Sequence, residues 1–133
     1  MKKIKAIIAM LAVCFLIAGC GDVSKVIILP SDSQLYSQNE IDSAIKVTKS
    51  YFKRYFDGCT MTELTYAGDE ITNAHKEFAT RHNADEVIVL TSSFDVDASG
   101  GDGSLNPNST YDGWMWILVR NKNGNWRHVD HGY

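Results

Sequence analysis

The chain has 133 residues, with 13 Lys plus Arg against 16 Asp plus Glu and a formal charge of −3. This length suits one small domain with a single core. The acidic balance argues against a nucleic-acid partner, because binding to phosphates needs a basic surface.

The chain opens with the layout of a secretory signal. Residues 1–19, MKKIKAIIAMLAVCFLIAG, start with lysines and continue into an apolar run that ends in small side chains. The junction Ile17-Ala18-Gly19-Cys20 resembles the lipobox of bacterial lipoproteins. The resemblance implies cleavage before Cys20 and a diacylglyceryl group on its sulfur. Two acyl chains anchor a protein stably, so we expect it on the extracytoplasmic face of the cell membrane, anchored without spanning it.

Cleavage would change both the charge and the cysteine count of the chain. Loss of Lys2, Lys3 and Lys5 lowers Lys plus Arg from 13 to 10 against 16 acids, so the formal charge becomes −6. Such a surface disfavours flat docking on anionic lipid, and the lipid on Cys20 is the predicted membrane contact. Cys59 is then the one unmodified cysteine, so no intramolecular disulfide is expected and the thiol is interpreted as a small buried hydrophobe.

Residues 20–36 contain little apolar sequence apart from Val26-Ile27-Ile28-Leu29. We interpret this region as a tether whose apolar patch adds, at most, one short strand to the body. The folded domain is therefore predicted over residues 37–133.

A helix is the first predicted element of the domain. Ser37-Gln38-Asn39-Glu40 is a capping box, and Tyr36 and Ile41 form the matching hydrophobic staple. Apolar residues then recur at helical spacing through Phe56, and Gly58 follows as the expected stop. The pattern predicts a long helix of about five turns that lies across a sheet.

Shorter elements follow this helix. Residues 63–66 are a weak strand candidate, and a second helix through Arg81 is expected, with one face formed by Ile71, Ala74, His75, Phe78 and His82. Residues 87–96 contain a β-branched run and then alternation, which predicts a central strand. Residues 114–120 predict another strand.

The segment 121–125 predicts a three-residue hairpin loop with Gly124 in the left-handed conformation, followed by a closing strand over 126–133. With Asn121 opposite Asn125, one face of the hairpin carries Trp114, Trp116, Leu118, Arg120, Trp126, His128 and Asp130. The other face carries Met115, Ile117, Val119 and Val129, and we expect it to pack against the long helix. A tighter two-residue turn, which would exchange the faces of the closing strand, is an open alternative.

The order of these elements predicts an α+β fold. It is similar to the cystatin-like or nuclear-transport-factor-like architecture, in which a curved antiparallel sheet wraps one long helix. The lipobox with AIKVTKSYFKRYFDGCTMTEL, NADEVIVL, SGGDGSLNPNSTY, WILVR and the terminal HGY resembles a family of small, uncharacterised Gram-positive lipoproteins that carry a domain of unknown function. The resemblance implies this fold and this location, and it brings no catalytic residues.

The glycine- and aspartate-rich run over 97–110 is the first candidate site. Its carboxylates and hydroxyls suit a calcium ion, which prefers six to eight oxygen ligands. Their spacing is not that of an EF-hand, and the run has no lysine for a phosphate. We interpret it as a connection, and as the rim of the tryptophan face; no cofactor or metal is predicted. The metal alternative would use Asp95, Asp97 and Asp102.

Histidine is the second candidate. His128 and Asp130 alternate onto one face near Arg120, where they suit an acid/base pair beside an aromatic platform. The interpretation that we favour is a cross-strand cluster of the three tryptophans, with His128 as a partly exposed neighbour. His128 and His131 differ by three positions, so on a regular strand they would face opposite ways and make a poor metal pair.

The sequence favours a non-catalytic, membrane-tethered recognition module outside the cell, because it lacks the usual catalytic motifs. Its ligand would be a small molecule, a peptide or a partner protein, bound by Trp114, Trp116, Trp126 and His128. A small enzyme with His128 and Asp130 as acid and base and Arg120 holding an anion is the first alternative. A calcium-stabilised envelope module is the second.

Overall fold

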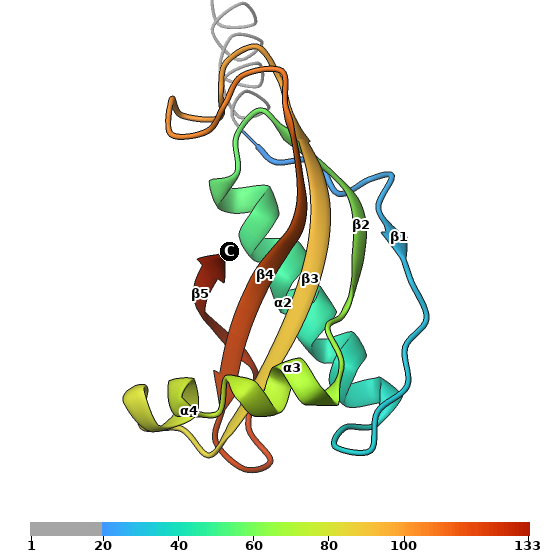
Figure 1. Ribbon diagram of the computed structural model, residues 1–133, viewed down its shortest axis with the longest axis vertical. Helices are drawn as coiled ribbons and strands as arrows, with labels where there is room; N and C mark the ends of the chain where they lie inside the picture. The colour runs from blue at the N-terminus through green and yellow to red at the C-terminus, as the bar shows by residue number, and fades with distance from the viewer. Residues whose placement is uncertain (1–19) are drawn as a thin grey trace, which may run out of the picture.

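A computed structural model describes residues 20–133; the predicted signal segment, residues 1–19, lies outside the described residues. The described part has an α+β fold with a five-stranded mixed sheet and three helices (Figure 1). In chain order the elements are β1 (Ile27–Ile28), α2 (Gln38–Tyr55), β2 (Cys59–Tyr66), α3 (Asp69–Ala74), α4 (Glu77–Arg81), β3 (Glu86–Val96), β4 (Thr110–Arg120) and β5 (Arg127–Gly132).

The strands lie in the order β1-β2-β3-β4-β5. The pairs from β2 to β5 are antiparallel, whereas β1 runs parallel to β2, with Ile27 opposite Glu63 and Ile28 opposite Leu64. The prediction of a wholly antiparallel sheet is therefore wrong at this edge. The reason is the connection: parallel neighbours need a crossover, and α2 provides it between β1 and β2.

The capping box at the start of α2 is confirmed. The backbone N–H of Glu40 donates to Ser37 Oγ at 3.2 Å, and the backbone N–H of Ser37 donates to Glu40 Oε1 at 2.9 Å. The helix has 18 residues and ends at Tyr55, with Phe56 as its C-cap. Gly58 follows at φ 73°, a left-handed conformation that suits glycine and turns the chain into β2.

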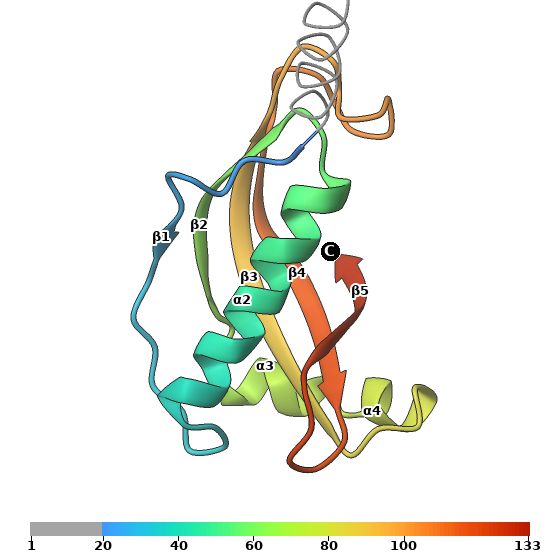
Figure 2. The same cartoon turned by 180° about the vertical axis from the view of Figure 1, so that it is seen from behind.

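The two faces of the sheet are covered by different helices, as the opposite views in Figures 1 and 2 show. Helix α2 packs on the face that carries Trp116, Leu118 and Trp126. Residues from α4, with Val87 and Val89, pack on the opposite face, which carries Met115, Ile117, Val119 and Val129. The prediction that this second set packs against α2 is wrong. Both faces of β4 are apolar, so its sequence alone does not predict which face packs against α2.

The second predicted helix is divided into α3 and α4, with a break at His75 and Lys76. Its buried residues are Thr72 and Ala79, whereas Ile71 is 40% exposed. Thr72 Oγ1 accepts a hydrogen bond from the backbone N–H of Val89 at 3.2 Å. The break lets each short helix place a different small side chain on β3.

The segment interpreted as a tether lies against the body. The backbone N–H of Gly21 donates to the Lys53 carbonyl at 2.9 Å, and Asp22 forms backbone bonds with Cys59 and Met61, also at 2.9 Å. Gly21 is buried, and a Cβ placed there would lie 2.3 Å from the Phe52 carbonyl oxygen. The chain is therefore seated on the body one residue after Cys20.

Gly21→Ala tests this contact. A methyl group has no room beside Phe52, so we expect the backbone hydrogen bonds of Gly21 and Asp22 to the body to break. The free energy of unfolding should fall by about 1–3 kcal/mol. Amide hydrogen exchange at Asp22 and Met61, in protein that begins at residue 20, should become faster. The exposed Lys25→Ala is the control and should leave both amides protected. Unchanged exchange in Gly21→Ala would contradict the packing.

Candidate functional site

Two of the three tryptophans predicted to bind ligand belong to the core. Trp116 is fully buried, its Nε1–H donates to Ser92 Oγ at 2.8 Å, and its ring lies 5.1 Å from that of Phe56. Trp126 is 5% exposed, and its Nε1–H donates to the Glu40 carbonyl at 3.1 Å. Trp114 alone of the three is partly exposed. Of the three, Trp114 is therefore the best placed to meet a ligand.

Arg120 is also engaged by its own neighbours. Its guanidinium forms ion pairs with Glu40 and with Glu86, the latter at 2.5 Å, and lies 4.2 Å above the ring of Trp126. The side chain is only 11% exposed. The proposed role of Arg120 in holding an anion is not supported, because its Nε and Nη2 already donate to two carboxylates, whose charge would repel an anion.

A β-bulge in β5 decides how the histidines lie. Val119 faces Arg127 and Leu118 faces His128, as expected for Asn121 opposite Asn125, but Ile117 then faces Asp130 and leaves Val129 as an extra residue. From that point the register is shifted by one. The left-handed residue of the hairpin loop is Asn123, at φ 61°, and not Gly124.

The bulge overturns both predictions about the faces of β5. Asp130 is opposite Ile117 and exposed, so it does not share a face with His128. His131 is opposite Trp116 and turns toward α2, so it shares the face of His128 instead. The acid/base pair of His128 and Asp130 is not formed.

His128 and His131 are in direct contact. Nδ1 of His131 lies 3.1 Å from Nε2 of His128, and the His128 ring stacks on Tyr51 with 3.8 Å between centroids. Burial, with a smaller contribution from His131, lowers the pKa of His128 to about 4. Burial also lowers the pKa of His131. Both imidazoles are therefore neutral near pH 7, and the N–H of one donates a hydrogen bond to the ring nitrogen of the other.

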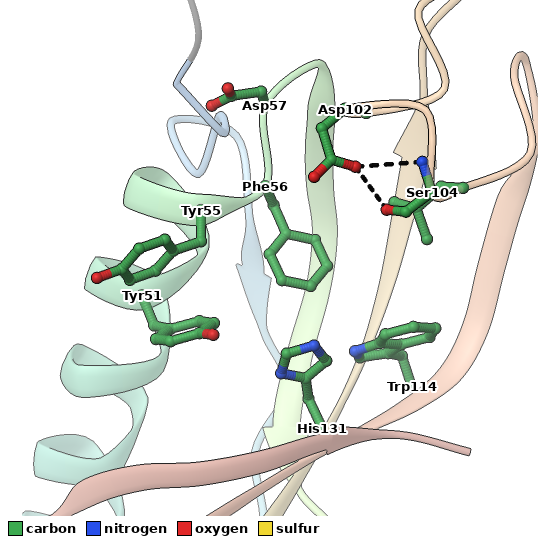
Figure 3. A pocket seen from close by; sticks show the side chains of 10 residues that line it. Tyr51, Tyr55, Phe56, Asp57, Asp102, Ser104, Trp114 and His131 are labelled. Atoms are coloured by element: carbon green, nitrogen blue, oxygen red, sulfur yellow. Dashed lines mark hydrogen bonds between the residues drawn. The ribbon is translucent and has the colours of Figure 1, made fainter.

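A pocket of about 430 Å³ opens at the end of α2, beside these rings (Figure 3). Figure 3 shows Trp114 and His131 side by side, with Phe56 above them and Tyr51 and Tyr55 arriving from α2. The volume is in the range of sites for small molecules. Its lining residues are Tyr51, Tyr55, Phe56, Asp57, Gly101, Asp102, Ser104, Leu105, Trp114 and His131.

Two buried polar atoms in this lining have no hydrogen-bond partner among the described residues: Trp114 Nε1 and Asp57 Oδ1. A buried polar atom without a partner is costly, usually by about 1–3 kcal/mol. Asp102 differs, because its Oδ1 accepts from the backbone N–H and the hydroxyl of Ser104, and these bonds lower the pKa of the carboxyl. Both unpartnered atoms are covered by protein, whereas Asp102 is exposed and gives the lining an ionised carboxylate.

The predicted calcium ligands do not converge. Asp95 accepts from Thr110 Oγ1 at 2.7 Å, Asp97 accepts from Ser99, and Asp102 is bonded to Ser104. Within residues 20–133 no three side chains of metal-binding type form a group. The loop does border the pocket, as expected of a rim, through Gly101, Asp102, Ser104 and Leu105.

The sequence reasoning missed the part of the pocket that α2 provides. Tyr51 and Tyr55 are one turn apart at the end of the helix, and Tyr55 is 58% exposed. The available signal was a pair of tyrosines four residues apart, followed by Phe56 and Asp57. The two cysteines differ: Cys20 is exposed, whereas Cys59 is buried, and burial, with Asp97 and Asp57, raises the pKa of its thiol to about 11. Cys59 is a buried hydrophobe, as predicted.

No family model, curated protein or solved structure matches the chain. The resemblance to small lipoproteins with a domain of unknown function therefore stays a prediction. Over residues 20–133, none of the helices has both the length and the apolar character that crossing a bilayer requires.

The stability of the domain should depend on pH through the histidine pair. The pKa of His128 is lowered from 6.5 to about 4, so between these values the unfolded chain binds more protons than the folded chain. The free energy of unfolding should therefore be greatest above pH 6.5 and fall as the pH falls, by about 1–2 kcal/mol after allowance for partial exposure. Urea titrations at pH 7.5 and 5.0 measure this difference. His128→Phe keeps a ring on Tyr51 and should reduce the difference; an unchanged difference would contradict the assignment.

The ion pairs of Arg120 should be structural. Arg120→Leu leaves Glu40 and Glu86 without their shared cation, and we expect a loss of about 2–4 kcal/mol in the free energy of unfolding. Arg81→Leu breaks an exposed pair with Glu77 and is the matched control, with an expected loss below about 0.5 kcal/mol. Both are measured by urea denaturation at pH 7.5. Equal losses in the two variants would contradict the distinction.

Proposed function

We propose that the protein is a membrane-anchored binding module on the extracytoplasmic face of the cell membrane, and that it binds a ligand without chemical change in the pocket at the end of α2. The lipobox ending at Cys20 supports the location. The observation that carries the binding role is the pocket itself, about 430 Å³ in volume, with aromatic walls from Tyr51, Tyr55, Phe56 and Trp114. Mostly apolar walls with a few polar groups are typical of sites for small molecules.

The placement of the titratable groups favours binding over catalysis. An acid/base mechanism by His128 and Asp130 requires both on one face, and Asp130 is exposed beyond the bulge. His131 does line the pocket, but the titratable group that it contacts is the half-buried His128, and its other ring neighbours are Tyr51, Phe56, Trp114 and Trp116. The calcium alternative loses its support as well, because its three carboxylates are bonded separately: Asp95 to Thr110 on β4, and Asp97 and Asp102 to serines of the loop.

We further propose that the architecture is of the cystatin-like or nuclear-transport-factor-like kind. Its support is the antiparallel meander of β2, β3, β4 and β5, which curves around α2 on one face (Figure 2). The parallel strand β1 is then an addition at the edge.

Cys20→Ala tests the location. Without its thiol the chain cannot take a diacylglyceryl group, so we expect it to leave the membrane fraction of the producing cells. Cys59→Ala is the control, because Cys59 is buried in the body, and that variant should stay with the membrane. Immunoblots of membrane and soluble fractions, with mass spectrometry of the N-terminal peptide, give the result. Retention of Cys20→Ala in the membrane would contradict the anchor.

A blocked pocket tests the binding role. Ser104 lies exposed at the mouth of the pocket, so Ser104→Trp places a large ring there, whereas Asn106→Trp places the same ring on the loop outside the lining. We expect compounds from a mixed small-molecule library to give saturation-transfer signals with the wild type and Asn106→Trp, and to lose them with Ser104→Trp. Signals that are equal in all three proteins, or absent from all, would count against the pocket.

A further inference from the structure

We propose that a groove between α2 and the segment that leads to β1 is a membrane-docking surface, and that it contacts the headgroups of anionic phospholipids. In Figure 2, α2 lies in front of the sheet with β1 beside it, and the groove between them has a volume of about 430 Å³. It shares no lining residue with the pocket at the end of α2. The inference therefore goes beyond the proposed ligand-binding role and gives the domain a membrane contact of its own.

The lining of the groove combines apolar side chains with a row of lysines. The apolar members are Val23, Ile28 and Ile45, and the basic members are Lys46, Lys49 and Lys53. Positions 46, 49 and 53 lie along one side of the helix, because they are three and four residues apart. Apolar groups beside lysines are typical of surfaces at a membrane interface, where the apolar groups enter the acyl boundary and the ammonium groups reach the headgroups.

The edge of the sheet extends this apolar surface. Ile27, Ile28 and Leu29 are consecutive in the chain, and all three are exposed. Ile28 also lines the groove, so the exposed apolar side chains are continuous with the lysines. Transfer of such side chains from water into the acyl boundary is favourable.

The basic charge of the domain is concentrated on this part of α2. Residues 43–56 contain four basic side chains, Lys46, Lys49, Lys53 and Arg54, and no acid. Residues 20–133 hold 10 Lys plus Arg against 16 acids, so without these four the balance is 6 against 16. The net charge of −6 therefore repels anionic lipid from most of the surface, but not from this stretch of the helix. Such an uneven distribution would orient the domain on an anionic membrane.

The fold does not use the charge of these lysines. The ion pairs of residues 20–133 involve Arg81 and Arg120, so the three lysines are unpaired within this part of the chain. The helix dipole favours a cation in the last turn, which accounts for Lys53. Lys49 lies before that turn, and it has lysines at positions 46 and 53, where like charges repel. Anionic headgroups in the groove would relieve this repulsion.

The position of the groove favours lipid as its occupant. The backbone N–H of Gly21 donates to the Lys53 carbonyl at 2.9 Å, which puts Cys20 beside the last of the three lysines. The acid of the lining, Asp42, lies toward the start of α2 and accepts a hydrogen bond from Gln38 at 2.8 Å. A lipid on Cys20 would hold the lysines near the headgroups, so that even a weak contact would be occupied.

Vesicle binding tests this surface. Residues 20–133 with Cys20→Ala carry no lipid and include every described element. We expect this protein to sediment with phosphatidylglycerol vesicles, to bind phosphatidylcholine vesicles at least about 10-fold more weakly, and to be released by about 0.5 M salt. Equal binding to both kinds of vesicle, or binding to neither, would overturn the inference.

Paired variants assign the lysines their part. Lys49→Gln with Lys53→Gln removes two charges from the groove, whereas Lys76→Gln with Lys122→Gln removes two exposed charges from elsewhere. The two proteins have the same net charge. We expect the first to bind phosphatidylglycerol vesicles about 10- to 30-fold more weakly than the parent protein, and the second to change by less than about 2-fold. Equal losses would refute the groove as the docking surface.

Two isoleucines of equal exposure test the apolar part. Ile28 and Ile71 are both 40% exposed, but only Ile28 lines the groove. We expect Ile28→Gln to weaken vesicle binding at least about 3-fold and Ile71→Gln to leave it unchanged. Urea denaturation of each variant verifies that it is folded. If folded Ile28→Gln binds as well as Ile71→Gln, the apolar contact is refuted.

A soluble anion is the other possible occupant of the groove. Glycerol 3-phosphate carries the phosphate without acyl chains, and we expect calorimetry to show no saturable binding of it. If it binds and loses affinity in Lys49→Gln with Lys53→Gln, while vesicles do not bind, the groove is a site for a soluble anion and the docking surface is overturned. None of these measurements depends on the lipid on Cys20 or on the pocket, so their failure would leave the proposed anchor and the binding role standing.

Discussion

The burial of Trp116 between α2 and the sheet is the contact on which the rest of the structure depends. Its ring meets Phe52 and Phe56 on the helix, and its N–H is held by Ser92 on β3. This contact sets how α2 lies across the sheet, because the indole is fully buried and cannot move without opening a cavity. The orientation of α2 in turn brings Tyr51 and Tyr55, which belong to the same last turns, to the pocket.

The bulge at Val129 keeps a carboxylate away from the buried ring of Trp116. In a regular register Asp130 would face Trp116, and a carboxylate would lie among aromatic rings at high cost. The extra residue moves Asp130 into solvent and puts His131 in its place. A neutral imidazole can be buried among aromatic rings when its polar nitrogen is hydrogen-bonded, and His128 provides the partner.

The sequence predicted the elements that have local signals. The capping box located the start of α2, and the apolar runs of β3 and β4 located the central strands. The bulge has no comparable signal, since Val129, Asp130 and His131 read as ordinary alternation, and both faces of β4 are apolar. The pocket could not be predicted from the sequence for another reason. Its lining comes from four separate parts of the chain, residues 51–57, 101–105, 114 and 131, which only the fold brings together.

Gly21 packs under the last turn of α2 and leaves no linker between Cys20 and the body. A flexible linker lets a domain sweep a volume that grows with its length, but here the body begins one residue after Cys20. The contacts of Asp22 with Cys59 and of Asp97 with Gly58 put the pocket loop at that same end (Figure 1). A lipid on Cys20 would therefore confine the pocket to the thin layer of solvent next to the headgroups, and the protein would sample only what arrives there.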